Sequence, residues 1–359
     1  MAKKILVVDD SALMRRVICD IIDSDERFQV VDRATNGLEA YDLLSKNQYD
    51  AVVLDVNMPK MNGLQLLEEL RKNKISAKVM MARTDTKEGA KTTLDALELG
   101  ALDFIHKPDS AMDCRVESFK VKLLSTLEVV ANSRPATFSS VSRVQENGQM
   151  AERMADLAKK FAGKNRGSKI VAIASSTGGP KSLQTVIPRL PAGLDAPVLL
   201  VQHMPKGFTA SLAERLNDLS QLKVKEAKEG EEIQNGTVYV SMGGMHMNVK
   251  NNGGTYTIHY SDEPAREGVK PCANYMYESL ADSRFDEIVC VVMTGMGADG
   301  TEGIRNLEAK KKVHVIAQNQ ESCVVYGMPK NVINAGLSDQ IVPLEQLAQE
   351  IALSVGVKA

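Results

Sequence analysis

The chain has 359 residues, of which 43% are hydrophobic and 25% are charged, so we expect a soluble globular protein of two domains. A formal net charge of −2 argues against a general nucleic-acid or acidic-membrane binder, and five scattered cysteines without a Cys-x-x-Cys pair argue against a disulfide framework or a zinc site. No stretch approaches the ~18 apolar residues of a membrane span, and the apolar run after Lys4 is too short for a signal peptide, so we expect a cytoplasmic protein without membrane insertion.

Residues 1–125 alternate short apolar runs with stretches of helical periodicity. The predicted strands are residues 5–8, 28–31, 51–54, 79–82 and 101–105. The predicted helices between them include residues 37–45, 64–72 and 91–99. This alternation predicts a doubly wound α/β domain with a parallel sheet, in which functional residues collect at the carboxyl ends of the strands.

Four charged residues follow the predicted strand ends of this first domain. Asp9 and Asp10 follow the first strand, Asp55 follows the third, and Lys107 follows the fifth. Packed carboxylates repel one another unless a hard cation lies among them, and Mg²⁺ prefers such oxygen ligands. Each aspartate alone could belong to a solvated acidic loop. Because all three lie at strand ends together with a lysine, we instead predict a functional metal site.

The charged residues at these strand ends stand in three distinctive segments: Val-Val-Asp-Asp-Ser, Leu-Asp-Val-Asn-Met-Pro and Asp-Phe-Ile-His-Lys-Pro. With these segments, residues 1–125 resemble a two-component response-regulator receiver, a flavodoxin-like fold. The resemblance implies that Asp55 accepts a phosphoryl group from a histidine kinase, that Lys107 pairs with the phosphate, and that Phe104 is the aromatic residue that reports switching. The metal and the lysine would neutralise charge on the transferring group. The Mg²⁺ ligands implied by the resemblance are Asp9, Asp10, Asp55 and the carbonyl oxygen of Asn57.

The end of the fourth predicted strand departs from the receiver pattern. A Ser or Thr that binds the phosphate normally ends this strand, whereas Ala82 or Arg83 stands there in this chain. Thr84 would substitute if the loop shifted by one residue. We therefore expect phosphorylation of Asp55 and leave open whether a hydroxyl drives the switch.

Residues 126–168 are predicted to be a linker between two domains. Residues 132–142 are polar and lack periodicity, which is typical of a tether. An apolar stripe at helical spacing then predicts an amphipathic helix, made by Met150, Met154, Leu157, Ala158 and Phe161. A helix packed on one of the domains is favoured over a helix that binds a partner.

From residue 169 to residue 359 the strand and helix alternation resumes. The predicted strands are residues 169–174, 197–201, 287–293 and 313–317. The predicted helices are residues 181–187, 208–217, 273–281 and 301–311. These predict a second, larger doubly wound α/β domain. Three further strands joined by Gly-rich and Asn-rich turns predict an antiparallel hairpin region: residues 236–240, 247–249 and 256–259.

The turn after the strand at 169–174 predicts a serine nucleophile. A serine on a sharp turn between a strand and a helix lies above the sheet edge, near the backbone N–H groups of the helix. Ser176 is the better candidate, because its neighbours two positions away are Ala174 and Gly178, close to Gly-x-Ser-x-Gly. Ser175 would have bulky β-branched neighbours instead. A simple polar turn or a phosphate-binding loop remains the alternative.

A histidine and an aspartate follow two other strands of the same domain. We expect His203 to be the general base, while His246, in a turn, is not excluded. Asp299 lies in a glycine-rich loop and is expected to orient the imidazole. This loop, residues 295–300, also matches the Gly-x-Gly-x-x-Gly dinucleotide motif, but Asp299 would then face a pyrophosphate, so a nucleotide site is the less favoured alternative.

The candidate residues stand in five distinctive segments of the second domain: Ala-Ile-Ala-Ser-Ser-Thr-Gly-Gly, Val-Gln-His-Met-Pro, Gly-Phe-Thr-Ala-Ser-Leu-Ala, Met-Thr-Gly-Met-Gly-Ala-Asp-Gly and Ala-Gln-Asn-Gln-Glu-Ser-Cys-Val-Val-Tyr-Gly-Met-Pro. With these segments, the second domain resembles the catalytic domain of chemotaxis-specific protein-glutamate methylesterases. The resemblance implies hydrolysis of glutamate γ-methyl esters on chemoreceptors, deamidation of receptor glutamines, no cofactor for ester hydrolysis, and control by receiver phosphorylation. It also points to oxyanion donors in the backbone N–H groups of Thr177 and Met296. We expect the enzyme to be monomeric.

Three positions depart from the pattern of that family. Ala174 replaces a glycine, Ser175 replaces an alanine, and residues 241–244 stand where the family usually has a proline. None of these changes removes a member of the predicted triad, so we expect activity to survive. A receiver adaptor whose second domain only binds partners is the remaining alternative from another functional class.

Overall fold

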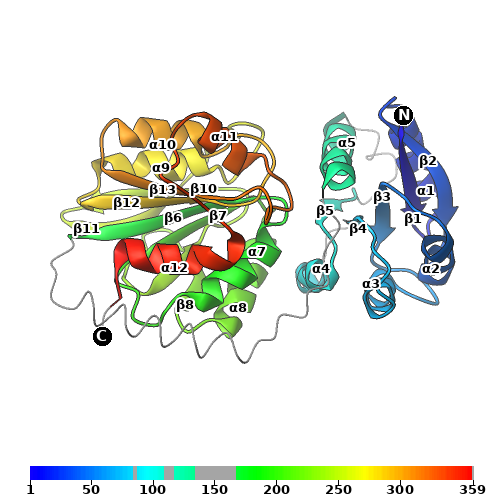
Figure 1. The fold of residues 1–359 in the computed structure, drawn as a ribbon, viewed down its shortest axis with the longest axis horizontal. Helices are drawn as coiled ribbons and strands as arrows, with labels where there is room; N and C mark the ends of the chain where they lie inside the picture. The colour runs from blue at the N-terminus through cyan, green and yellow to red at the C-terminus, as the bar shows by residue number, and fades with distance from the viewer. Residues whose placement is uncertain (84–86, 109–116, 134–166, 358–359) are drawn as a thin grey trace. The chain divides into compact units, whose positions relative to one another are not determined.

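The chain divides into two compact units, Met1–Ser140 and Val141–Ala359, in the computed structural model (Figure 1). The structure describes residues 1–83, 87–108, 117–133 and 167–357. The expected domain boundary at residue 125 falls inside a helix that continues to Asn132. The expected linker helix at residues 150–161 lies outside the described residues.

The first unit contains a five-stranded parallel sheet. Its strands are β1 (Lys3–Val8), β2 (Phe28–Ala34), β3 (Ala51–Asp55), β4 (Val79–Arg83) and β5 (Asp103–His106). Its helices are α1 (Ala12–Asp23), α2 (Gly37–Lys46), α3 (Gly63–Lys72), α4 (Lys87–Leu99) and α5 (Glu117–Asn132). The strand order β2-β1-β3-β4-β5 is the flavodoxin-like order, so the prediction for this unit is confirmed.

The types of residue in this unit explain where its interior strands are buried and where its helices begin. Strand β3 is buried along its whole length, which explains its unbroken apolar run between two helix layers. Ser11 caps α1 by accepting a hydrogen bond from the Met14 N–H group. Gly63 begins α3, and a Cβ there would come within 2.4 Å of the Asp55 carbonyl oxygen. The glycine therefore lets α3 pack directly against the end of β3.

The second unit contains a seven-stranded sheet, also parallel, in the order β14-β13-β12-β6-β7-β9-β8. Its strands are β6 (Lys169–Ser175), β7 (Val198–Gln202), β8 (Lys223–Glu226), β9 (Thr237–Val240), β12 (Glu287–Val292), β13 (Val313–Gln318) and β14 (Gln340–Val342). A separate antiparallel pair is formed by β10 (His246–Asn252) and β11 (Thr255–Ser261). The prediction of two doubly wound parallel sheets with an antiparallel hairpin is confirmed.

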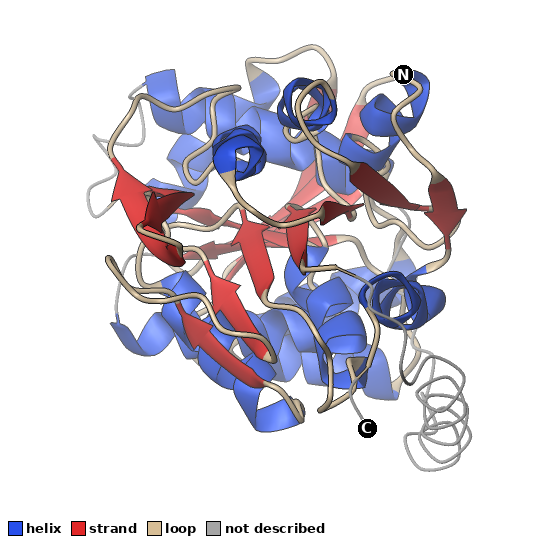
Figure 2. Cartoon of the chain, turned by 90° about the vertical axis from the view of Figure 1, so that its left-hand side faces the viewer, coloured by secondary structure: helices blue, strands red, loops and turns tan. Residues whose placement is uncertain are grey.

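Helices cover both faces of the larger sheet. In Figure 1, α9, α10 and α11 lie on one face, while α7, α8 and α12 lie on the other. Figure 2 likewise shows strands running between helices on both sides. The helices are α7 (Gly179–Val186), α8 (Phe208–Leu219), α9 (Ala273–Ser279), α10 (Thr301–Glu308), α11 (Met328–Asn334) and α12 (Leu344–Val355). Short 3₁₀ turns follow two of them, η2 (Ile187–Arg189) and η3 (Leu280–Asp282).

For one predicted strand, the expected neighbouring strands are wrong. The segment at residues 236–240 was expected to join the antiparallel hairpin region, but β9 lies between β7 and β8 and is parallel to both. All four of its residues are buried, as a strand inside a parallel sheet requires. Its closeness in sequence to β10 suggested the wrong neighbour. The elements β8, β14, α11 and α12 were not predicted.

Within the described ranges, no helix has the length and apolar character needed to cross a membrane.

The central position of β6 generates a prediction about stability. Ile173 in β6 is fully buried, whereas Ile341 in the edge strand β14 is 52% exposed. We expect Ile173→Ala to destabilise the protein by about 2–5 kcal/mol, because the substitution leaves a cavity in the core. Ile341→Ala, the matched control, should change stability by less than about 0.5 kcal/mol. Urea unfolding followed by circular dichroism measures both, and equal shifts would contradict the central placement of β6.

Candidate functional site

The carboxyl ends of three adjacent strands bring the predicted site segments of the second unit together. Strand β6 lies between β12 and β7, with Ala174 paired to Val292 and Ser175 paired to Gln202. From β6 the chain passes to β7 on one side and returns to β12 on the other. Such a reversal in strand order leaves a crevice beyond the strand ends, where α/β proteins bind their ligands.

The turn that carries Ser176 is held by backbone contacts. The Ser176 N–H donates to the Thr294 carbonyl oxygen at 3.0 Å, and the Ser176 carbonyl accepts from Gly179 N at 2.7 Å. A Cβ on Gly295 would come within 2.7 Å of Ser176 Cβ, so the β12 loop lies directly against the serine. Gly178 adopts the left-handed conformation (φ 77°) that begins α7. The backbone therefore presents Ser176 at the crevice.

The two adjacent serines have different surroundings. Ser175 is fully buried, and its hydroxyl donates to Gln202 Oε1 at 2.7 Å. Ser176 is half-buried, and across the described ranges its hydroxyl makes no hydrogen bond to His203 or to any other residue. Catalytic hydrogen bonds often form only when substrate is bound. The accessible hydroxyl is therefore that of Ser176, the residue favoured from the sequence.

His203 and Asp299 form a buried pair at the same sheet edge. His203 Nε2 lies 2.7 Å from Asp299 Oδ2, although the residues are 96 positions apart in the chain. The side chains are 9% and 2% exposed, respectively. The other ring nitrogen, Nδ1, is buried and has no hydrogen-bond partner among the described residues. With a proton on Nε2 shared with Asp299, Nδ1 carries the free lone pair of the imidazole.

Asp299 is held in an ionised state by several donors. The carboxylate accepts from Cys272 Sγ at 3.0 Å, from Ala273 N at 2.6 Å and from Asn274 N at 2.9 Å, in addition to His203. Burial by itself would raise the pKa of Asp299, but His203 and these donors outweigh it and lower the pKa below its ordinary value. A negative charge is thus fixed beside the imidazole.

His246, the alternative base, is committed to backbone groups. It is fully buried, and its Nδ1 accepts from the Cys272 N–H at 3.1 Å. Its Nε2 lies 3.1 Å from the Glu263 carbonyl oxygen and 3.2 Å from the Pro264 carbonyl oxygen. Burial lowers the pKa of His246, consistent with a neutral ring whose proton sits on Nε2. Neither nitrogen is available to a substrate.

The glycine-rich loop at residues 295–300 serves packing rather than a phosphate. Its carboxylate, Asp299, points into the protein toward the start of α9. Asn274 Oδ1 accepts from the Gly300 and Gly303 N–H groups at 3.0 and 2.6 Å, so the start of the following helix is already bound. Phosphate sites at helix starts require free N–H groups and no facing carboxylate. The geometry does not support the nucleotide interpretation.

The two expected oxyanion donors flank this crevice. Met296 is 45% exposed, and within the described part of the chain its backbone N–H has no protein acceptor. Thr177 follows Ser176, and its carbonyl oxygen accepts from Thr294 Oγ1 at 3.0 Å. Their contribution to an oxyanion hole stays a prediction.

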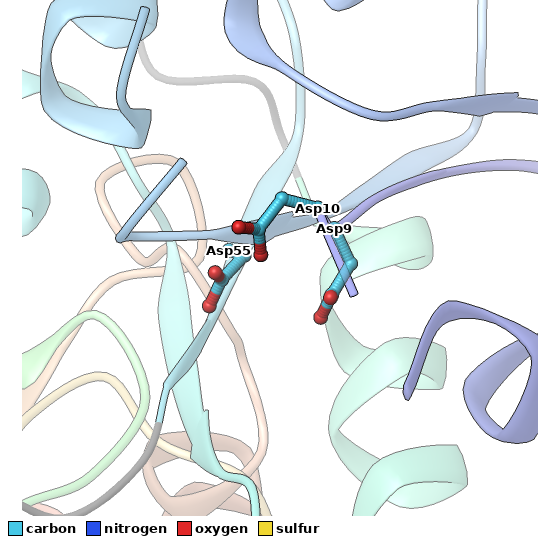
Figure 3. A group of neighbouring side chains, drawn as sticks. All are labelled: Asp9, Asp10 and Asp55. Atoms are coloured by element: carbon cyan, nitrogen blue, oxygen red, sulfur yellow. The ribbon is translucent and has the colours of Figure 1, made fainter. Parts of the chain in front are cut away.

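The first unit gathers its aspartates as expected. One carboxylate oxygen from each of Asp9, Asp10 and Asp55 lies within 4.8 Å of the others. Figure 3 shows Asp10 and Asp55 turned toward one another, with Asp9 beside them. Asp9 and Asp55 are buried and Asp10 is exposed, so an ion would reach the cluster from solvent. Three oxygen donors at this spacing suit a hard cation such as Mg²⁺.

Lys107 contacts this acidic cluster directly. Its Nζ lies 2.8 Å from Asp9 Oδ2 and 2.5 Å from Asp55 Oδ1. Burial would lower the pKa of Lys107, but Asp55 and Asp9 outweigh it and raise the pKa. The lysine is therefore charged and points at the predicted phosphorylation position.

The remaining predicted receiver residues lie at or after the ends of β3 and β4 and within β5. Arg83 ends β4, is 4% exposed, and donates from Nη1 to Thr93 Oγ1 at 3.0 Å. Thr84 lies outside the described residues, so the position of its hydroxyl stays untested. Phe104, in β5, makes an edge contact with His106 at 5.9 Å between ring centroids. Asn57 is exposed after β3.

Known families and proteins match both units of the chain. The CheB methylesterase family matches residues 171–351, and the response regulator receiver domain family matches residues 5–115. A protein named protein-glutamate methylesterase/protein-glutamine glutaminase 1 from Syntrophomonas wolfei is 42% identical over 97% of this chain and 98% of its own length. A relative named protein-glutamate methylesterase/protein-glutamine glutaminase from Bacillus subtilis is 40% identical, covering 98% of both chains.

The chain belongs to the CheB methylesterase family.

A solved structure supports the same assignment for the second unit. The crystal structure of the Thermotoga maritima CheB methylesterase catalytic domain is 41% identical, with a TM-score of 0.50. It covers 51% of this chain, and 97% of that domain is matched. The resemblance stated from the sequence motifs is therefore confirmed at the level of the family, and the chain carries both a methylesterase domain and a receiver domain.

The structure shows what surrounds Ser175 and the 241–244 segment, which were expected to depart from the family pattern. Ser175 fits because its hydroxyl is satisfied by Gln202 Oε1. The amide of Gln202 also donates to the Ser176 carbonyl at 2.9 Å and to the His203 carbonyl at 3.3 Å. In the 241–244 segment, Gly243 packs so closely on Pro205 that a Cβ would come within 2.2 Å of its carbonyl oxygen. That segment thus supports the turn after His203.

Three supporting residues were missed from the sequence: Gln202, Cys272 and Asn274. Gln202 ends β7 immediately before His203, so a polar residue at the end of an apolar strand was its only signal. The other two lie near residue 273, and nothing in the sequence links them to Asp299.

Gln202 generates a prediction, because it connects the serine turn and the histidine turn. Gln202→Leu should lower stability by about 1–3 kcal/mol, since the Ser175 hydroxyl and the Ser176 carbonyl lose their partner. We also expect esterase turnover to fall. Gln346, exposed on α12, provides the matched control Gln346→Leu. Thermal unfolding and ester hydrolysis measure both effects, and unchanged values for Gln202→Leu would exclude a role in holding the turns.

Proposed function

We propose that this chain hydrolyses glutamate γ-methyl esters on chemoreceptors, releasing methanol, and deamidates receptor glutamines, with Ser176, His203 and Asp299 as its catalytic triad. The observation that carries the proposal is the buried pair of His203 and Asp299 beside the Ser176 turn. The names of the relatives supply the substrate class. The enzyme would act in the cytoplasm as a monomer, and its hydrolytic step would need no cofactor.

The proposed acyl transfer starts at the free nitrogen of the imidazole. Nδ1 of His203 takes the Ser176 proton while the serine oxygen bonds to the ester carbonyl carbon. The ring orientation supports Nδ1 as the proposed base, whereas serine proteases of the trypsin type use Nε2. Asp299, already ionised, stabilises the resulting imidazolium through Nε2.

Collapse of the tetrahedral intermediate breaks the bond to the methoxy oxygen, which leaves as methanol with the proton from His203. Water then attacks the acyl-serine with His203 again as base, and the products are the glutamate carboxylate and free Ser176. The N–H groups of Thr177 and Met296 are proposed to receive the oxyanion, where a preorganised donor lowers the barrier by several kcal/mol, about 3–4 in one measured case. In deamidation, the same steps release ammonia instead of methanol.

The two adjacent serines test the nucleophile. Ser176→Ala should reduce methanol release from methylated chemoreceptor membranes by at least about a thousandfold, because the acyl-enzyme cannot form. Ser175→Ala, the matched control, should retain most of the activity, since the Ser175 hydroxyl is buried and bonds to Gln202. Circular dichroism should show both variants folded. Near-normal turnover in folded Ser176→Ala would refute the assignment.

We propose that the receiver controls this activity through phosphorylation of Asp55 by a chemotaxis histidine kinase. Asp9, Asp10, Asp55 and the carbonyl of Asn57 are the proposed Mg²⁺ ligands, supported by the spacing of the three carboxylates. Bound Mg²⁺ would neutralise charge on the phosphoryl group as it is transferred. Lys107 is proposed to hold a phosphoryl oxygen, and the contact of its Nζ with the Asp55 carboxylate supports this role.

Two aspartates at opposite ends of β3 provide a test of the phosphorylation site and its control. Asp55→Asn should abolish the increase in methanol release caused by Mg²⁺ and a small-molecule phosphodonor, while basal release continues. That increase is expected to be severalfold to about a hundredfold, the range of common allosteric coupling energies. Asp50→Asn, just before β3 and at its opposite end, should respond as the wild type does. A full response in Asp55→Asn would remove Asp55 as the phosphorylation site.

A further inference from the structure

A buried thiol contacts the catalytic carboxylate directly. Cys272 is fully buried, and its Sγ lies 3.0 Å from Asp299 Oδ1. The same oxygen accepts from Asn274 N, whereas Oδ2 accepts from Ala273 N and faces His203. Among the described residues, each carboxylate oxygen therefore has two partners. The thiol is the side-chain partner on the oxygen that does not face the imidazole.

The thiol can only be the donor in this contact. Burial raises the pKa of Cys272, and the negative charge of Asp299 raises it further, so the sulfur keeps its proton at neutral pH. The Asp299 carboxylate is ionised and can only accept. The hydrogen bond thus runs from S–H to Oδ1.

The backbone around the thiol is anchored by a second buried group. The Cys272 N–H donates to His246 Nδ1, and the opposite nitrogen of that ring lies against the carbonyls of residues 263 and 264. The His246 ring also packs on Tyr275, with 4.5 Å between ring centroids. These contacts hold residue 272 in place, so its S–H group is aimed at Asp299 by the fold.

We propose that Cys272 is a positioning residue of the esterase reaction: its S–H group fixes the rotation of the Asp299 carboxylate and withdraws part of its charge, which sets how strongly Asp299 holds protonated His203. This inference rests on the proposed role of His203 as base. The competing explanation is that Cys272 only fills space at the start of α9, as buried cysteines often do.

Three substitutions separate these explanations. Cys272→Ser keeps a donor of similar size and makes it stronger, since a hydroxyl is a better donor than a thiol. Cys272→Ala removes the donor and some volume. Cys272→Val removes the donor and keeps apolar volume. Cys290, buried in β12, gives the control Cys290→Ala for loss of a buried thiol that is not bonded to Asp299.

The informative measurement is the pH profile of kcat/KM for methanol release by the full chain. Without the donor, Asp299 keeps more charge and favours the imidazolium, so the acid limb should move to higher pH by about half a unit in Cys272→Ala and Cys272→Val. The Cys272→Ser limb should move to lower pH. We expect kcat to fall on the order of threefold to tenfold in the two variants without a donor and to be retained in Cys272→Ser, as loss of one hydrogen bond predicts. Cys290→Ala should leave the limb where it is.

An unmoved limb in Cys272→Ala and Cys272→Val, or a serine variant that behaves like alanine, would overturn the proposal and leave a packing role. The titration of His203 followed by NMR in a Ser176→Ala background provides a measurement independent of turnover. In that titration, the pKa of His203 is expected to be lowest in Cys272→Ser, higher with Cys272 itself and highest in Cys272→Ala. If the wild type released no methanol, the proposed function would fail, while this titration would still decide the role of Cys272.

Discussion

A single buried charge organises the catalytic unit. The carboxylate of Asp299 is almost completely removed from water, a situation that costs several kcal/mol unless hydrogen bonds and an opposite charge compensate it. Compensation comes from the start of α9, from the thiol of Cys272 and from His203. Because these donors lie on different segments, the need to satisfy one carboxylate joins the β12 loop to the end of β7. The geometry of the imidazole follows from this constraint.

In each unit, the candidate functional residues lie at the carboxyl ends of the strands of its own parallel sheet. The two units differ in how their charged residues are arranged. The receiver gathers three carboxylates beside Lys107, an arrangement that suits a cation and a phosphoryl group. The methylesterase unit instead buries one carboxylate under an imidazole and leaves a serine hydroxyl at the crevice. Parallel strands end at a common edge, so residues far apart in the chain meet there without long loops.

Much of the fold was predictable because parallel strands buried on both faces have unbroken apolar runs. Strands β1, β3, β6, β7 and β12 were all predicted on that pattern, and a polar residue at the end of each strand or in the loop after it was assigned to the functional edge. Strand β9 was also recognised as a strand, but its predicted partners were wrong, because four residues of β-forming type do not specify which neighbours they pair with. The charged strand β8 and the short edge strand β14 carry too little apolar signal to be predicted.

The sequence by itself determined the two-unit α/β organisation, the family, and the candidate residues Ser176, His203 and Asp299, because strand-end motifs are local in the chain. Only the tertiary structure decided which imidazole nitrogen faces the carboxylate, that His246 is committed to backbone groups, and that Cys272 donates to Asp299. These contacts join residues many positions apart, and their partners depend on side-chain rotation and strand order. Local pattern holds no information about either, because packing in three dimensions selects them.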